Sequence, residues 1–374
     1  MLASTGGGVL GKVFCFNQPD LYIADSHVTI IRTREQLSGR YLYYYLSVRY
    51  DAINALLSKG STNQTELQEF PLKNIPVPVP PRDEQDQIVR YLDWQVSKIN
   101  RLIAAKRKQI ELLEETKTNQ ATNAVLYGIK SYNNYTETEV FGNIPAHWKV
   151  IHNKRLFHER AEYTETGKEL LLSVSKHYGV KPSSELTDDE QYATIKPALS
   201  LVGYKIVHKG DLAMNIMRAR NGSYGISVYD GIVSPAYCVY YVTRKCNAMY
   251  LHYLLRTPQM RSLFEAYSTG IAEHRRRLYP ESFLRLNSIL PPVIEQDEIV
   301  EHIEQTRIKY DMAINKLQQQ VTCLQDMKTR LISDVVTGQI DVRGIEVPDY
   351  EHYDETLESS TGESSDSDYY DSQE

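Results

Sequence analysis

Basic side chains crowd one short run in the second half of this 374-residue sequence. In this run a histidine, His274, is followed directly by Arg275, Arg276 and Arg277. An arginine guanidinium can fork onto guanine O6 and N7 or onto a phosphate, so the run predicts contacts to nucleic acid. A solvated basic loop is the alternative for any such cluster.

A second group of candidate contacts lies in the stretch MRARNGSYG, which holds Arg218, Arg220 and Asn221. Guanidinium and amide groups both suit base edges, and the glycines around them suit a tight turn. A turn with no ligand is the alternative here. Three weaker candidates, for phosphate contacts or plain surface, are Lys205, His208 and Lys209.

Other chemistries fail on the motifs that they require. Gly6, Gly11 and Lys12 fit GxxxxGK, but Val13 follows where a phosphate loop needs Ser or Thr and a helix. His158 and Glu159 have no second histidine at zinc-helix spacing. There is no adenine-methyltransferase signature and no PD…ExK arrangement, so the sequence predicts no catalytic residue, no metal site and no cofactor of its own.

Two long stretches that resemble each other must position these side chains. The stretch from Pro80-Pro81 aligns without a gap on the stretch from Pro291-Pro292, as far as Lys117-Thr118 on Lys328-Thr329. Each copy steps by fours and threes between seam residues, which predicts a helix with a coiled-coil stripe. About 45 residues of helix would extend for roughly 65 Å. Packing of the two copies on each other would bury both stripes, and the periodicity allows either orientation.

The repeat extends into the segments that precede each helix. Ile23–Leu46 overlays Ile232–Leu255, and MLASTGG overlays AMNIMRA, so the chain is expected to begin inside a strand of its first globular segment. That segment is therefore expected to be truncated or completed from elsewhere. At the place of the arginine run, the first copy has different chemistry that suits adenine, which two different half-sites would require: Ser61, Thr62, Asn63 and Gln64. Simple divergence of a loop is the alternative.

Composition sets further bounds on the protein class. The net charge is -6, but residues 345–374 hold 11 acidic and no basic residues, so the rest of the chain is positive. An acidic tail rich in Ser is expected to be disordered. No apolar run is long enough to span a membrane, and the N-terminus has no signal peptide. The four cysteines show no metal spacing and are expected to be free thiols in a reducing cytoplasm.

Taken together, these motifs resemble the specificity subunit of type I restriction-modification systems. The two PPxxEQxxIV entries, each opening a long helix after a globular half, are the specific signal. Further support comes from an IPxHW segment, a GDLxxxxxR element and a glycine before each polar loop; these are Ile144–Trp148, Gly210–Arg218, and Gly60 with Gly270.

The resemblance implies an α+β fold, in which repeated α/β target-recognition domains are joined by two long helices packed as an antiparallel coiled coil. The expected parts are a partial domain (1–82), a spacer helix (83–130), a second domain (131–290), a second helix (291–340) and the acidic tail (341–374).

The resemblance also implies function. Each domain would read half of a bipartite site in double-stranded DNA, and the subunit itself would catalyse nothing. Methyltransferase subunits and a restriction-translocase subunit would dock and would bring S-adenosylmethionine and ATP. The helix entries would dock these partners through Glu84, Gln85, Ile88, Glu295, Gln296 and Ile299. A scaffold that binds no DNA and an inactive truncated relic are the alternatives.

Overall fold

A computed structural model describes most of the chain and divides it into two compact units. Unit 1 comprises Met1–Leu112 and Ala313–Glu374, and unit 2 comprises Leu113–Met312. The residues that the structure describes are 2–3, 11–16, 22–24, 28–50, 53, 58–59, 66–67, 74–176, 178–186, 200–243, 245–270 and 276–353. Within these ranges, no helix is both long enough and apolar enough to cross a membrane.

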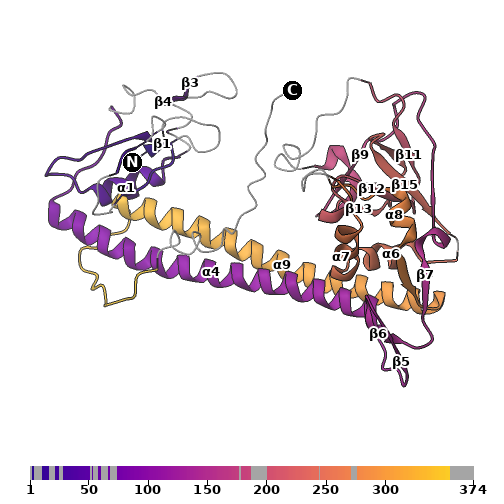
Figure 1. Cartoon of the computed structure of the whole chain (residues 1–374). Coiled ribbons are helices and arrows are strands. Elements are labelled where there is room, and N and C mark those ends of the chain that lie inside the picture. Colours follow the sequence, from indigo (N-terminus) through magenta and orange to yellow (C-terminus); the bar gives the residue numbers. More distant parts are fainter. Residues whose placement is uncertain are drawn as a thin grey trace. The chain divides into compact units, whose positions relative to one another are not determined.

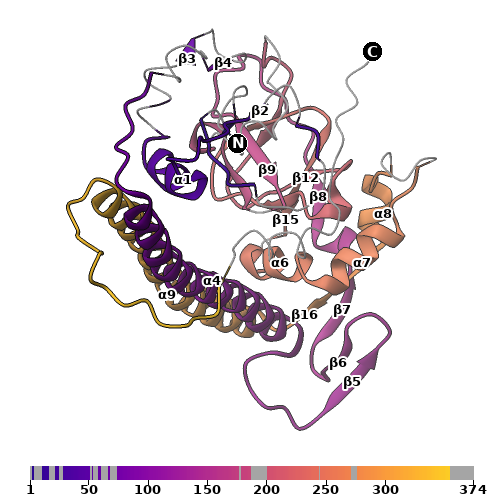
Figure 2. The same ribbon diagram turned by 90° about the vertical axis from the view of Figure 1, so that its left-hand side faces the viewer.

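The two long helices predicted from the repeat are present as α4 (Arg82–Tyr127) and α9 (Val293–Val336). They pack together in an antiparallel orientation (Figures 1 and 2). In unit 1, Lys106 Nζ donates to Gln320 Oε1 at 2.7 Å, and in unit 2, Lys117 Nζ meets Asp311 Oδ1 at 3.0 Å. These pairs advance along α4 while they recede along α9, so they settle the orientation that periodicity left open.

Unit 2 is built on a four-stranded antiparallel sheet in the order β13-β12-β15-β8. Its central strand β12 is buried along its whole length and alternates between two cores. Leu212 and Met214 face a core shared with the helices, whereas Ala213 faces a second core with Val239 on β15. The strands of this sheet are β8 (Phe157–Glu159), β12 (Leu212–Asn215), β13 (Tyr224–Ile226) and β15 (Tyr237–Val242).

Shorter elements complete the two faces of this sheet. Two antiparallel strand pairs line the second core: β9 (Leu172–Ser175) with β10 (Gly179–Pro182), and β11 (Lys205–Val207) with β14 (Gly231–Val233). Helices α6 (Ala248–Leu255), α7 (Pro258–Ala266) and α8 (Pro280–Arg285) cover the first. The other strand pairs in the described part of unit 2 are β5 (Tyr135–Thr138) with β6 (Gly142–Pro145), and β7 (Lys149–His152) with β16 (Asn287–Leu290). Its described 3₁₀ turns are η1 (Asn153–Arg155), η2 (Ser183–Glu185) and η3 (Ala219–Asn221).

Unit 1 repeats part of this plan. Its strands β1 (Leu2–Ala3) and β2 (Val28–Thr29) pair in the register Leu2↔Thr29, which is the counterpart of Met214↔Cys238 in unit 2. The overlay of the chain start on β12 is therefore confirmed by strand pairing. A second small pair joins β3 (Ser58–Lys59) and β4 (Glu66–Leu67).

A short helix follows β2 in unit 1. Helix α1 covers Gly39–Ser47, and Val48 is its C-cap. Its apolar face buries Tyr41, Tyr44 and Tyr45. Gly60 lies outside the described residues. The proline-rich stretch 75–80 forms no strand, because proline cannot donate to a strand ladder.

The two units anchor their domains to the helices through matching contacts. Tyr41 of α1 donates its hydroxyl to the Val336 carbonyl at 3.4 Å, at the end of α9. Its counterpart Tyr250 of α6 donates to the Val125 carbonyl at 3.3 Å, at the end of α4. Each domain is thus fixed to the beginning of its own long helix and to the end of the other one. Figure 2 shows α1 beside the helix pair.

Candidate nucleic-acid interface

The arginine run before α8 is only partly available to a ligand. Arg276 closes the C-terminal end of α7, because its guanidinium donates to the Ser268 carbonyl at 3.1 Å and to the Glu265 carbonyl at 3.0 Å. Arg277 pairs its backbone with Thr269 and keeps its side chain exposed. His274 and Arg275 lie outside the described residues. Of the described part of this run, Arg277 is the side chain that offers surface for a contact.

The turn at η3 holds the second predicted group together on the surface. Asn215, at the end of β12, accepts from the Met217 backbone at 3.1 Å, and Gly222 closes the turn with φ +90°. Ala219 is fully buried in the core and fixes the turn from below. As a result Arg218 and Asn221 are exposed and Arg220 is half-buried beside them. The structure therefore brings together the three residues that the sequence predicted as a patch.

A basic cavity adjoins this turn, and no spacing in the sequence pointed to it. Lys176, Arg256 and Arg261 line a cavity of about 290 Å³ together with Asn221, Gly222 and Tyr224.

 A separate cavity of about 460 Å³ lies in unit 1, beside the start of α4. None of the residues lining the cavity of unit 2 is acidic. Guanidinium and ammonium groups without a nearby carboxylate suit a phosphate.

The three basic residues of this cavity differ in how firmly they are held. Arg256 donates to the Tyr224 carbonyl at 2.9 Å and also to the Lys176 carbonyl, so its guanidinium is fixed on backbone. Burial lowers the pKa of Arg256, since a buried environment disfavours its charge. Lys176 and Arg261 are exposed at the rim. Their positions on a hairpin turn and on α7 explain why sequence spacing did not group them with η3.

A close crossing of two glycines places these elements side by side. A Cβ on Gly225 of β13 would lie 3.0 Å from the Gly179 Cα of β10, which leaves no room for a side chain at this crossing. His252 packs under the crossing, and its Nδ1 accepts from the Ile226 backbone at 3.1 Å. Burial, together with the charge of Arg256, lowers the pKa of His252 to about 3, so the ring is neutral.

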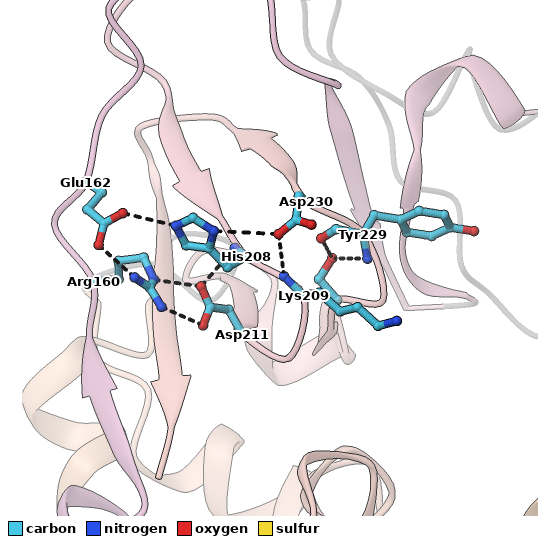
Figure 3. Close-up of polar contacts among 8 residues, drawn as sticks. Arg160, Glu162, His208, Lys209, Asp211, Tyr229 and Asp230 are labelled. Atoms are coloured by element: carbon cyan, nitrogen blue, oxygen red, sulfur yellow. Dashed lines mark hydrogen bonds and ion pairs between the residues drawn. The ribbon is translucent and has the colours of Figure 1, made fainter. Parts of the chain in front are cut away.

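The GDL element fixes the turn before β12. The carboxylate of Asp211 is buried and accepts from Arg160 at 2.7 and 3.1 Å and from the His208 backbone at 2.9 Å (Figure 3). Hydrogen bonds to Asp211 raise the pKa of Arg160, against the effect of burial. A bidentate pair of this kind holds the chain in one geometry. The GDL element therefore positions β12 and η3 and does not itself offer a DNA contact.

The three weaker candidates lie around this network and are mostly engaged. Lys205 donates to the Tyr237 carbonyl at 2.7 Å, and the His208 ring meets Glu162 at 3.1 Å. Hydrogen bonds from His208 and Arg160 lower the pKa of Glu162. The Lys209 side chain points away from the carboxylates of the network in Figure 3. Lys209 is thus the one of the three whose side chain extends freely from this cluster.

The candidates of the first copy cannot be compared with these in the same way. Ser61, Thr62, Asn63 and Gln64 lie outside the described residues, as do residues 4–8, the counterpart of the η3 turn. Contacts by these residues stay a prediction.

The residues expected to dock partners have roles inside the chain. Gln85 is buried, accepts from the Ser38 backbone at 2.7 Å and donates to the Pro80 carbonyl at 2.8 Å. Gln296 does the same with the Asn247 backbone at 2.8 Å and the Pro291 carbonyl at 2.7 Å. Because Ser38 and Asn247 are the N-caps of α1 and α6, each glutamine joins a helix entry to its domain.

The other members of that set follow the same pattern. Ile88 and Ile299 are buried in the cores of their own units. Glu295 is almost buried and accepts from Tyr132 and from His147, the latter at 2.8 Å. Burial raises the pKa of Glu295, but these hydrogen bonds outweigh it and the net shift is downward. His147 belongs to the IPxHW segment, so this segment also serves attachment. Glu84 is half-buried, and partner docking at these six positions stays a prediction.

Comparison with known proteins links this chain to a protein family. Residues 1–112 match the type I restriction modification DNA specificity domain. The chain is 22% identical over 356 residues to the type I restriction enzyme MjaVIII specificity subunit of Methanocaldococcus jannaschii, covering 91% of this chain and 78% of that protein. The resemblance to type I specificity subunits is thereby confirmed.

Two further comparisons agree with this family. A putative type I restriction enzyme MjaX specificity subunit of the same organism is 26% identical over 145 residues, which cover 38% of this chain and 33% of that protein. A solved structure described under complex assembly and conformational transition of the type I R-M system matches with a TM-score of 0.52 at 14% identity, covering 82% of this chain and 73% of that one. The latter likeness shows a fold shared with a chain of that structure.

Proposed function

We propose that this chain is the DNA-reading subunit of a type I restriction-modification complex and directs methyltransferase and restriction-translocase subunits to a bipartite site. The observation that carries the proposal is the surface at η3 of unit 2. Arg218 and Asn221 project from a turn that a buried alanine and a left-handed glycine hold in place. A rigid turn that presents a guanidinium and an amide suits readout of base edges in the major groove.

The cavity beside this turn supports the same proposal. Base readout requires that the protein be held in register on the duplex, and contacts to phosphates supply that register. Lys176 and Arg261 provide cationic groups at the cavity rim, next to Asn221. We assign them to phosphate contacts, and Arg218, Arg220 and Asn221 to base or groove contacts. Arg277 is assigned to phosphate, since its side chain is exposed on the loop before α8.

Partner docking is assigned to the exposed apolar side chains of the long helices. Leu102 and Met327 are about half exposed in unit 1, and Ile308 and Met312 are more than half exposed in unit 2. Exposed apolar side chains suit protein association where they form a patch on a helix surface, and we assign these four residues to it. Under this proposal the subunit acts in the cytoplasm and catalyses nothing, and its partners bring S-adenosylmethionine and ATP.

The decisive experiment is methylation-sensitive sequencing of host DNA with and without this gene. Loss of methylation at one split sequence motif is expected on deletion. The gene carrying Arg218→Ala, Arg220→Ala and Asn221→Ala should fail to restore the motif, or should relax it in one half, because each lost base contact costs about 1–3 kcal/mol of discrimination. The control is Lys154→Ala, an exposed lysine outside the patch and outside the other candidate contacts. Unchanged methylation on gene deletion would refute the proposed function.

A further inference from the structure

The segment that follows α9 is packed on α4 within unit 1. Gln87 of α4 donates to the Val342 carbonyl at 3.0 Å and to the Ile345 carbonyl at 2.6 Å. Ser97 accepts from the Tyr353 backbone at 2.7 Å, and Val342 is only 2% exposed. The yellow segment beside α4 in Figures 1 and 2 is this part of the chain. The expected acidic tail begins at residue 341, but residues 341–353 make these contacts with α4 and belong to unit 1.

This segment advances along α4 in the direction of the helix. Its carbonyls at 342 and 345 lie at Gln87, its residue 353 lies at Ser97, and Glu351 pairs with Arg101 at 3.1 Å. Residues 87, 90, 97, 101 and 108 share one face of α4, because steps of three, four and seven return to the same side of a helix. The segment therefore follows one face of α4 and leaves it pointing towards Lys108.

From Lys98 to Lys108, the same face of α4 carries basic side chains. Lys98, Arg101 and Lys108, together called the basic stripe here, are exposed. The sequence of α4 has no acidic residue between Asp93 and Glu111. The helix α9 repeats only one residue of this stripe: Lys309 is the counterpart of Lys98, but Met312 and Gln319 are the counterparts of Arg101 and Lys108. The basic stripe is thus particular to the helix on which the C-terminal segment lies.

The chain that continues from Tyr353 has the complementary charge. Residues 354–374 hold eight acidic and no basic residues, and three of them come at once as Asp354, Glu355 and Glu358. Ser97 and Lys108 are separated by about 16 Å of helix. About five extended residues span that distance, so the first quarter of the tail is long enough to cover the stripe.

We propose that the acidic tail, residues 354–374, docks on the basic stripe of α4 and shields it from other polyanions. The ion pair between Glu351 and Arg101 is the first contact of this docking. One exposed pair stabilises little, so binding rests on several carboxylates of one segment that is already tethered at Ser97. A DNA backbone would compete for the same three side chains.

Zero-length carbodiimide cross-linking of the full chain, read by mass spectrometry, tests the docking. Links from Lys98 and Lys108 to Asp354, Glu355 or Glu358 are expected at low salt, and their yield should fall several-fold at about 1 M salt, where the Debye length is near 3 Å. Lys316, exposed in unit 1 on α9, is the control lysine and should form few links to the tail. Equal linking of Lys316, or no links to the stripe, would overturn the docking.

A second measurement tests the shielding. A chain ending at Tyr353 keeps every described contact and should bind a duplex of arbitrary sequence at least several-fold more tightly than the full chain at low salt. A full-length chain with all eight tail acids changed to Asn or Gln should gain equally. Adding Arg101→Gln and Lys108→Gln to the shortened chain should remove the gain. No gain on shortening would show that the tail does not shield the stripe.

Discussion

The two units attach their domains to the long helices in the same way but differ in the sheet that each domain carries. Gln85 and Gln296 make matching bonds, and so do Tyr41 and Tyr250. In unit 2, Ile232 of β14 is fully buried, whereas its counterpart Ile23 in unit 1 is 98% exposed. The repeat thus preserves attachment, and the described part of unit 1 lacks the second core.

The difference continues along the strand that follows. Val239 of β15 is fully buried in the second core of unit 2, and its counterpart Ile30, directly after β2, is 51% exposed. Residues of β9, β10, β11 and β14 line this core in unit 2. What the comparison teaches is that attachment and recognition are separate parts of the domain, which rest on separate sets of contacts.

The largest expected effect comes from truncating the two matched isoleucines. Ile232→Ala should lower the free energy of unfolding of unit 2 by about 2–5 kcal/mol, because it removes buried apolar atoms and leaves a cavity. Ile23→Ala should change unit 1 by no more than about 0.5 kcal/mol, as for a surface position. Denaturant unfolding followed by tryptophan fluorescence measures both, since Trp94 lies in unit 1 and Trp148 in unit 2.

Each tryptophan can be isolated by changing the other to Phe, so that one signal reports one unit. A large loss for Ile23→Ala would show that unit 1 has a buried core around that residue, and the contrast drawn between the units would fail.

A smaller effect is expected when the matched glutamines are removed. Gln85→Ala and Gln296→Ala each leave a buried backbone N–H and a proline carbonyl without their partner. The expected cost is about 2 kcal/mol in each unit, within the usual range for an unsatisfied buried group. The same single-tryptophan chains report the two losses. A loss confined to one unit would show that the matching bonds are not equivalent in energy. In unit 1, Gln85 also donates to the Gln36 carbonyl, so Gln85→Ala removes this additional hydrogen bond.

Sequence periodicity predicted the helices well, because a stripe that must be buried leaves a regular pattern. It also found the repeat and the η3 patch, whose residues are close in sequence. It missed the cavity of Lys176, Arg256 and Arg261, because these residues meet only through the glycine crossing of β10 and β13. The family resemblance assigned Gln85 and Gln296 to partner docking, which stays a prediction; a polar residue at a helix entry gives no sign that its amide is buried.

The smallest expected effect concerns acid. The pKa of His252 is lowered to about 3 in the folded chain, so the unfolded chain binds a proton first as the pH falls. The stability that the neutral ring contributes is complete above about pH 6.5 and is lost progressively between pH 6.5 and 3. Unit 2 should therefore lose on the order of 1 kcal/mol per pH unit in the upper part of this window.

Unit 1 serves as the internal control for this pH dependence. Its counterpart of His252 is Tyr43, which stays neutral throughout the window. His252→Asn keeps an acceptor for the Ile226 amide without the titrating ring, so it should flatten the profile of unit 2 between pH 6.5 and 5, where few carboxylates titrate. Urea unfolding at each pH, followed through Trp148 alone, gives the profile. If the slope persists after the substitution, the acid sensitivity of unit 2 belongs to groups other than His252.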